Sequence, residues 1–184
     1  MVFVRITYEN RFDTLIIMRY NVDTIKERRT QTMYTIYFDM DGTIADLYGV
    51  TNWLPRLRAE DATPYADAAP MIDTAEFQLL LAILQNRGYK LGIISWLAKN
   101  STNSYKKAVA KAKKEWLTKT FPEITFDEMH FVQYGTRKDY VAKDKNGIIF
   151  DDDERVREKW RGKAINPNIE DIIEKLRLIK EMSE

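Results

Sequence analysis

From Met33 onward, short apolar runs alternate with amphipathic segments of helical periodicity. This alternation predicts an α/β fold with a parallel central sheet. The run 148–150 is apolar on successive residues, as expected of a strand that is covered on both faces. The strands are expected at residues 34–39, 89–95, 129–133, 147–151 and 164–165.

Capping residues mark the helices between these strands. Asp73 and Glu76 form a capping box ahead of an apolar stripe, and Gly88 is expected to end that helix. Ser101 or Thr102 can begin the next helix. Helical spacing predicts a last helix over 169–182, whose apolar stripe consists of Ile169, Ile172, Ile173, Leu176 and Ile179.

Two regions interrupt the alternation. Residues 1–32 contain two β-like stretches, and Met33 is an alternative start, so an appended β element and an upstream extension both remain open. Residues 47–73, called the insert below, contain three prolines and several aromatic residues, and they predict a short helical excursion and a loop. The remaining residues, 33–46 and 74–184, are expected to form the core.

Charge and residue counts exclude several classes of site. The chain has 29 basic and 28 acidic residues, so its net charge of +1 favours no stable nucleic-acid partner and no acidic membrane. It has no cysteine, which excludes thiolate nucleophiles and cysteine-containing zinc sites. Its one histidine, His130, excludes a two-histidine metal centre, and we expect it to be structural. Carboxylates, lysines and hydroxyls remain, and these suit magnesium and phosphate.

The sequence gives no indication of a membrane segment. Its longest apolar run, 79–84, is far shorter than the ~18 residues needed to span a bilayer, and its N-terminal residues contain no long apolar signal segment. We therefore expect a cytoplasmic protein. No feature of the sequence indicates an oligomeric state.

The segment Asp39-Met40-Asp41-Gly42-Thr43 directly follows the first apolar strand. Ligands of open parallel sheets bind at the carboxyl ends of the strands, so both carboxylates are placed where a site is expected. Gly42 allows a sharp turn or a close approach of the backbone to a ligand. Asp-x-Asp-Gly also occurs in ordinary loops, but the apolar strand before it makes this example more specific.

This arrangement resembles the first motif of the haloacid dehalogenase superfamily of phosphohydrolases, an apolar strand followed by Asp-x-Asp-Gly-Thr or -Val. Counterparts of three further motifs follow in the same order: Ser95 at the end of a strand, Lys138 near a helix start, and Asp151-Asp152 after an apolar strand. The resemblance covers residues 33–166. It implies a Rossmann-like three-layer sandwich with a central parallel sheet and a small cap, the insert, after the first motif.

The resemblance also implies catalytic roles. Asp39 is expected to attack phosphorus and form an aspartyl-phosphate, and Asp41 is expected to act as the general acid and base. Ser95 and Lys138 are expected to hold phosphate oxygens. The implied reaction is hydrolysis of a phosphomonoester, either a nucleotide or another small phosphorylated metabolite.

The same resemblance implies a Mg²⁺ site. Asp39, the backbone carbonyl of Asp41 and Asp152 are the expected ligands, with Asp151 in support. Asp153 is expected to cap a following helix over 154–160 instead.

Two groups of lysines allow different assignments. Lys143 and Lys145 compete with Lys138 for the phosphate-binding role, and Lys138 is preferred because it opens an expected helix. The helix that follows Thr102 is rich in lysine, and we expect these side chains to form a solvated face: Lys106, Lys107, Lys111, Lys113 and Lys114.

The insert contains aromatic and basic residues that suit either substrate binding or packing on the core. Four residues are candidates for substrate binding: Trp53, Arg56, Tyr65 and Trp96. Arg58, also in the insert, allows the same two interpretations as Arg56, and Trp96 lies outside the insert, directly after Ser95. The layout is similar to that of the 5'(3')-deoxyribonucleotidases, but the insert is shorter than their cap, and Ser95-Trp96 stands where those proteins usually have Thr-Ser.

Two alternatives belong to other functional classes. A phospho-accepting receiver domain uses similar residues, but there the acidic pair precedes the phosphorylated aspartate, whereas here the order is reversed. A catalytically reduced binding or adaptor protein on the same scaffold would use residues 1–32 as its interaction element. The four motifs argue against this, because loss of catalysis usually removes a nucleophile or a metal ligand.

Overall fold

A computed structural model of the chain describes residues 34–183, so the β-like stretches expected in residues 1–32 lie outside the described residues. A five-stranded parallel sheet has the order β5-β4-β1-β6-β7 and confirms the expected α/β fold. Each strand end lies within one residue of its predicted position. The strands are β1 (Thr35–Phe38), β4 (Lys90–Trp96), β5 (Glu128–Val132), β6 (Ile148–Phe150) and β7 (Lys163–Ile165).

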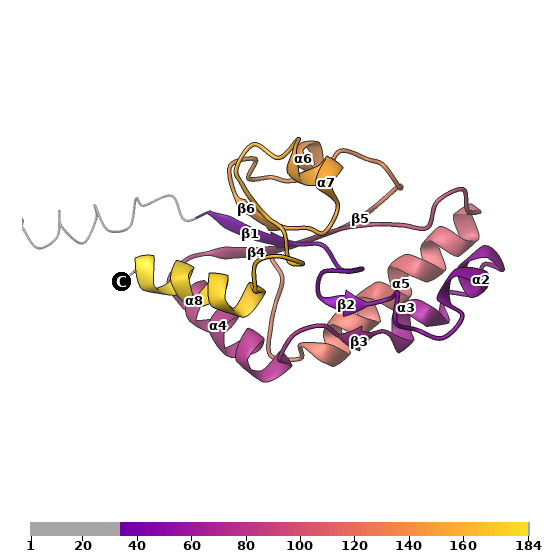
Figure 1. The fold of residues 1–184 in the computed structure, drawn as a ribbon, viewed down its shortest axis with the longest axis horizontal. Helices are drawn as coiled ribbons and strands as arrows, with labels where there is room; N and C mark the ends of the chain where they lie inside the picture. The colour runs from indigo at the N-terminus through magenta and orange to yellow at the C-terminus, as the bar shows by residue number, and fades with distance from the viewer. Residues whose placement is uncertain (1–33, 184) are drawn as a thin grey trace, which may run out of the picture. The chain divides into compact units, whose positions relative to one another are not determined.

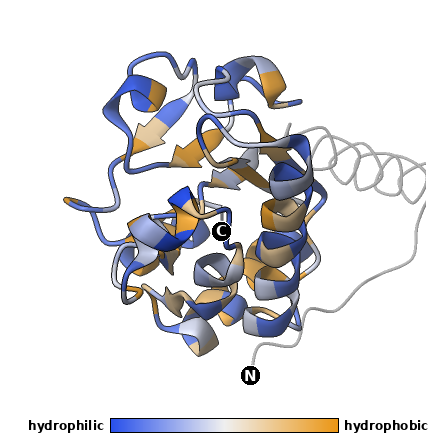
Figure 2. Cartoon of the chain, turned by 90° about the vertical axis from the view of Figure 1, so that its right-hand side faces the viewer, coloured by the Kyte–Doolittle hydropathy of each residue, from blue (hydrophilic) through white to orange (hydrophobic). Residues whose placement is uncertain are grey.

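Helices cover both faces of the sheet (Figure 1). One face packs against α4 (Thr74–Asn86) and α8 (Ile172–Met182), and the other faces α6 (Lys138–Val141) and α7 (Glu154–Arg157). Hydrophobic residues, orange in Figure 2, run along the strands, whereas the helices carry both hydrophobic and hydrophilic residues. The result is the expected three-layer sandwich.

The side chains of β1 alternate between these two layers because successive residues of a strand point to opposite faces. Phe38 packs on Phe77 of α4 with ring centroids 5.1 Å apart. Tyr37 points the other way and meets Trp160 at 5.4 Å. All four aromatic residues of these contacts are buried, so the central strand is covered on both faces.

The expected caps determine where the helices begin and end. The Asp73 carboxylate accepts hydrogen bonds from the backbone N–H groups of Ala75 and Glu76, and Gly88 follows the helix with a φ of 94°. Thr102, not Ser101, caps α5 (Asn103–Thr120). Among residues 34–183, no helix combines the length and the apolar character needed to cross a membrane.

Two helices are shorter than predicted. α7 ends at Arg157, and Trp160 beyond it is buried with its indole N–H donating to the carbonyl of Gly147. α8 begins only at Ile172, because the carboxylate of Asp171 accepts from the N–H of Glu174 and caps the helix there. Ile169 was expected in the buried stripe, but it precedes the cap and is 80% exposed.

The insert forms the helical excursion that its sequence predicts. It contains α2 (Trp53–Arg58) and α3 (Thr63–Asp67), and a two-stranded antiparallel ladder joins its ends. The ladder consists of β2 (Ala45–Asp46) and β3 (Ala69–Pro70). The insert lies beside α5 (Figure 1).

Hydrogen bonds from α5 hold the insert in place. The indole N–H of Trp116 donates to the carbonyl of Ala68 at 2.7 Å, and the Tyr105 hydroxyl donates to the carbonyl of Asp61 at 2.9 Å. At the start of the helix, Thr102 donates from its N–H and its hydroxyl to the carboxylate of Glu60. These contacts fix one wall of the site described below.

Candidate active site

Three of the predicted site residues meet where β1, β4 and β6 end. Asp39 follows β1, Ser95 lies near the end of β4, and Asp151 follows β6. The N–H of Asp39 donates to the carbonyl of Phe150 at 2.9 Å, which joins the ends of β1 and β6. Because parallel strands end at the same edge of a sheet, residues distant in sequence are brought together here.

Lys138 joins this group from the first position of α6. Its ammonium lies 2.7 Å from Asp151 Oδ2 and 3.0 Å from Asp39 Oδ1, and its side chain is fully buried. Burial opposes the charged form of Lys138, but the two carboxylates outweigh this and raise its pKa above the usual value. Lys143 and Lys145 are exposed. The geometry therefore favours Lys138 over them for a role at the site.

Three carboxylates can hold a metal ion. Asp39, Asp151 and Asp152 each offer an oxygen, and these oxygens lie within 4.8 Å of one another. Burial, followed by the charge of Asp39, raises the pKa of Asp152 to about 6. Burial also raises the pKa of Asp151, against the opposing effect of Lys138. Such a cluster of acidic oxygens favours a hard cation, and its donors fit Mg²⁺.

Gly42 makes room for this cluster. Its φ is 78°, and a Cβ at this position would lie 2.6 Å from Oδ2 of Asp152 and 2.8 Å from the ring of Tyr48. Any larger residue would displace one of them. The carboxylate of Asp41 is not part of the metal-binding group, so the role expected for Asp41 there involves only its backbone carbonyl.

Asp41 is instead bound by Lys113, a residue that the sequence places on a solvated surface. The ammonium of Lys113 donates to Asp41 Oδ2 at 2.6 Å, to Ser95 Oγ at 2.8 Å and to the carbonyl of Trp96 at 2.8 Å. Its side chain is fully buried. The expectation of a solvated face is therefore wrong for Lys113, although Lys114 next to it is exposed.

The periodicity of α5 explains this difference. Buried residues recur along the helix with the spacing of one helical face, and Lys113 takes one of these positions. The others are Tyr105, Val109, Ala112, Trp116 and Leu117. The pattern of the helix, rather than its lysine content, was the signal that identifies this residue.

The buried environment also affects Asp41 itself. Burial raises the pKa of Asp41, and the charge of Lys113 opposes this effect. The side chain of Asp41 keeps 18% of its surface exposed. One carboxylate oxygen is held by Lys113, and the residue still lines the cavity described next.

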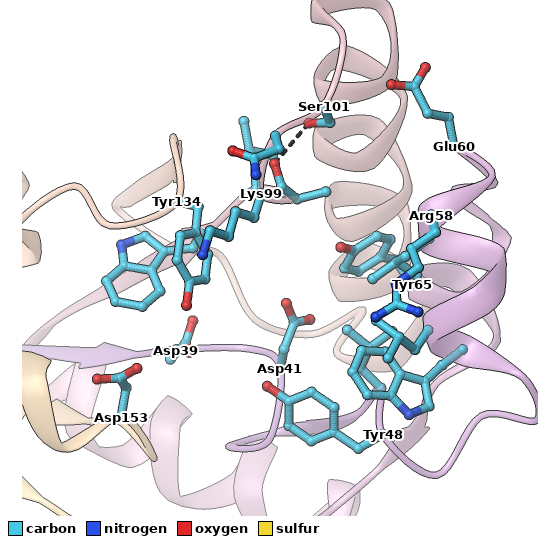
Figure 3. A pocket seen from close by; sticks show the side chains of 18 of the residues that line it. Asp39, Asp41, Tyr48, Arg58, Glu60, Tyr65, Lys99, Ser101, Tyr134 and Asp153 are labelled. Carbon is cyan, nitrogen blue, oxygen red and sulfur yellow. Dashed lines mark hydrogen bonds between the residues drawn. The ribbon is translucent and has the colours of Figure 1, made fainter.

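A cavity of about 710 Å³ opens over these carboxylates (Figure 3). Asp39 and Asp41 lie on its floor, Asp39 below Tyr134 and Asp41 between Tyr134 and Tyr65. Three of the four predicted substrate-binding residues line it, namely Trp53, Tyr65 and Trp96. Ser95 and Lys138 are fully buried and lie behind the lining residues.

Arg56, the fourth predicted substrate-binding residue, does not line this cavity. Its guanidinium forms ion pairs with Asp61 at 2.8 Å and Asp67 at 3.1 Å within the insert. Arg58 lines the cavity in its place and extends inward beside Tyr65 (Figure 3). Within residues 34–183, the guanidinium of Arg58 has no hydrogen bond and no ion pair. Arg56 and Arg58 are two positions apart on α2 and therefore lie on different faces of the helix. The sequence alone did not show which of the two faces the cavity.

Asp153 and His130 lie where their predicted structural roles place them. The carboxylate of Asp153 accepts from the N–H of Arg155 at 2.9 Å and caps α7, although Asp153 also lines the cavity. His130 lies on β5, where its Nε2 is 2.7 Å from the carboxylate of Glu128. That carboxylate also accepts from the hydroxyl of Tyr37, and the cavity does not include His130.

Comparison with known proteins assigns no family to the chain, since no family model and no curated protein matches it. The functional argument therefore depends on the residues of the site. These are an acidic cluster with a buried lysine, a second acid with its own buried lysine, and a cavity with aromatic walls.

Proposed function

We propose that this protein is a magnesium-dependent phosphomonoester hydrolase that acts through an aspartyl-phosphate on Asp39. One observation carries the proposal. The four sequence motifs that resemble those of the haloacid dehalogenase phosphohydrolases converge at one edge of the sheet, with Lys138 between Asp39 and the acidic pair. Residues 39, 95, 138 and 151 are far apart in sequence, and each belongs to a chemical type that phosphoryl transfer uses.

Asp39, Asp151 and Asp152 would hold the magnesium ion, together with the backbone carbonyl of Asp41. When bound, the ion would supply positive charge that lets a carboxylate approach an anionic phosphate and that stabilises the charge of the transition state. Lys138 contributes a fixed positive charge beside the nucleophile from within the protein. The two cations together offset most, but not all, of the negative charge of three carboxylates and a phosphate.

Asp39 and Asp41 have environments that suit different roles. An oxygen of Asp39 attacks phosphorus, and the bond from phosphorus to the ester oxygen breaks. Asp41 gives its proton to the departing ester oxygen, and burial supports this role because it raises the pKa of Asp41. Asp41 then takes a proton from water, whose oxygen attacks the aspartyl-phosphate and releases phosphate and the free Asp39 carboxylate.

Ser95 and Lys138 are the groups proposed to hold the transferring phosphoryl oxygens. Lys113 donates to Ser95 Oγ, so the hydrogen of the Ser95 hydroxyl is not used in that contact and could bond to a phosphate oxygen that reaches past the lining residues. Positive charges and hydroxyl donors beside phosphorus lower the activation free energy most where negative charge accumulates in the transition state.

The cavity supports a small organic phosphate as the substrate. Its volume of about 710 Å³ is within the usual range for small-molecule sites, and Tyr48, Trp53 and Tyr65 give it an aromatic wall. A nucleotide is one such substrate, because a base can stack on aromatic side chains. Other phosphorylated metabolites with a flat or apolar portion fit the same description.

The proposal is tested by phosphate release from nucleoside monophosphates, sugar phosphates and a nitrophenyl ester, with magnesium and with a chelator. We expect release that requires magnesium and that falls by at least ~10³-fold in Asp39→Asn, because the amide cannot form the covalent intermediate. Acid-quenched protein incubated with labelled phosphoester should retain label on the wild-type chain and lose it in the variant.

Asp73→Asn is the matched control. It makes the same chemical change at an exposed helix cap, where asparagine also caps well, so we expect wild-type turnover. Full activity of Asp39→Asn would contradict the proposal. A folded wild-type protein that binds magnesium but releases no phosphate would favour the binding-protein alternative instead.

A further inference from the structure

Lys113 is the one fully buried lysine, within residues 34–183, that none of the four sequence motifs includes. We propose that Lys113 is a positioning residue, which holds the carboxylate of Asp41 in the orientation that delivers its proton to the leaving group. This inference rests on the proposed function and assigns a new part of its machinery, contributed by the middle of α5.

The hydrogen bonds of Lys113 fix its ammonium completely. An ammonium has three donors and no acceptor, and all three donors are used. Two of them anchor the group to β4, through Ser95 Oγ and the carbonyl of Trp96, each at 2.8 Å. The third goes to Asp41 Oδ2 at 2.6 Å, and the ring of Tyr65 lies 4.9 Å from the same nitrogen.

These contacts hold only one of the two carboxylate oxygens of Asp41. Oδ2 is held by a group that is itself anchored to the sheet, while the residue keeps part of its surface open to the cavity. The other oxygen, Oδ1, is therefore the one available to a ligand. A general acid works only when it lies within hydrogen-bond reach of the proton's destination, so the anchor determines whether Asp41 is productive.

Burying a lysine at this position costs desolvation free energy, and a functional role would explain why the residue is nevertheless charged. A buried charge is stabilising only where its hydrogen bonds are complete, and an apolar residue of similar size often serves stability equally well. The neighbouring positions of the same helix face are apolar, and Lys113 alone departs from this pattern. Lys113 lies opposite Asp41, the carboxylate that must be held in a fixed orientation.

The experiment compares two leaving groups in single turnovers of the full chain, measuring release of the alcohol from a nitrophenyl phosphate and from a simple alkyl phosphate. Nitrophenolate leaves without a proton, whereas an alkoxide needs one from Asp41. In Lys113→Met we expect alcohol release from the alkyl ester to fall by ~100-fold or more, and from the nitrophenyl ester by less than ~10-fold.

Lys114→Met is the matched control, because it removes an exposed lysine from the adjacent position of the same helix and should leave both rates unchanged. Equal losses for the two esters in Lys113→Met would overturn the positioning role and leave a purely structural one. Absence of turnover for both esters in the wild-type protein would instead contradict the proposed function, and the role of Lys113 with it.

A second variant covers the case in which Lys113→Met fails to fold because Asp41 loses its buried partner. The double variant Asp41→Asn/Lys113→Met removes both charges. If Lys113 acts through Asp41, alkyl phosphate turnover in the double variant should match that of Asp41→Asn within about threefold. A further ~10-fold loss in the double variant would show that Lys113 acts independently of Asp41 and would overturn the proposal.

Discussion

At the scale of single residues, the site is organised as two acids, each with a buried lysine. Lys138 lies beside Asp39 and Lys113 beside Asp41. The charged form of a buried carboxylate is destabilised unless a positive charge or hydrogen bonds compensate it. Lys138 does so for Asp39 and Asp151, and Lys113 does so for Asp41. The two acids of one short motif thereby acquire separate environments, which is what a nucleophile and an acid require.

A prediction at this scale concerns Arg58. Its guanidinium extends into the cavity and has no hydrogen bond or ion pair in the described part of the chain, so it is available to an acceptor on the substrate. We expect Arg58→Ala to raise KM by about 10- to 150-fold, with kcat within about threefold, because a hydrogen bond to a charged group contributes ~1.5–3 kcal/mol. Steady-state kinetics on the best substrate of the panel measures this.

Arg56→Ala is the control for Arg58. Arg56 is paired with Asp61 and Asp67 outside the cavity, and we expect its replacement to leave KM unchanged. A rise in KM for Arg56→Ala equal to that for Arg58→Ala would show that the insert as a whole, and not the Arg58 guanidinium, determines the affinity for substrate.

At the scale of helices and strands, the local sequence predicts the elements well where one signal dominates. The apolar strands and the caps at Asp73 and Thr102 were located to within one residue because each depends on neighbouring residues only. The start of α8 was missed because Ile169 has helical spacing, yet the cap at Asp171 decides where the helix begins. Capping chemistry there outweighs hydrophobic periodicity.

The sequence predicted those residues of the candidate site that belong to a recognisable motif. Asp39, Asp151 and Lys138 follow or precede recognisable strands and helices, and the structure brings them within hydrogen-bonding distance. Lys113 was not identified, because its partners Asp41 and Ser95 lie 72 and 18 residues away and no local pattern connects them. The helical spacing of the apolar residues of α5 nevertheless includes Lys113. A charged residue at such a buried position indicates a functional role.

A prediction at the element scale concerns the attachment of the insert to α5. Trp116 donates from its buried indole N–H to the carbonyl of Ala68 at 2.7 Å. Trp116→Phe keeps an aromatic ring but leaves that carbonyl without its donor, so we expect a loss of ~1–3 kcal/mol in the free energy of unfolding. Urea denaturation measures this loss.

Trp53→Phe is the comparison for Trp116→Phe. Trp53 is only partly buried, and its indole has no hydrogen bond to any residue of the described range 34–183, so its replacement should cost less than half as much stability. Equal costs would mean that ring volume, and not the hydrogen bond to Ala68, determines how firmly the insert is held.

At the scale of the whole molecule, the proposed metal site would link folding to metal binding. The pKa of Asp152 is raised to about 6 in the folded protein, above the 3.8 of the unfolded chain, by burial and by Asp39. Between these two pH values the folded state holds a proton that the unfolded state lacks. The metal-free protein therefore loses stability as pH rises from about 4 to 6, and at neutral pH it bears the full cost of the charged cluster.

Magnesium should remove part of this cost, and its effect should depend on pH. At pH 7.5 and about 100 times its Kd, the ion should stabilise the fold by about 2.7 kcal/mol, or about 5–10 °C in Tm. At pH 5 magnesium must displace a proton from Asp152, which weakens magnesium binding by about 1.4 kcal/mol and should halve the shift in Tm.

The variant Asp152→Asn should be more stable than the wild type in chelator at pH 7.5, and magnesium should hardly change its Tm. A magnesium shift that is equal at both pH values, or that survives in Asp152→Asn, would mean that the ion binds elsewhere than at Asp39, Asp151 and Asp152.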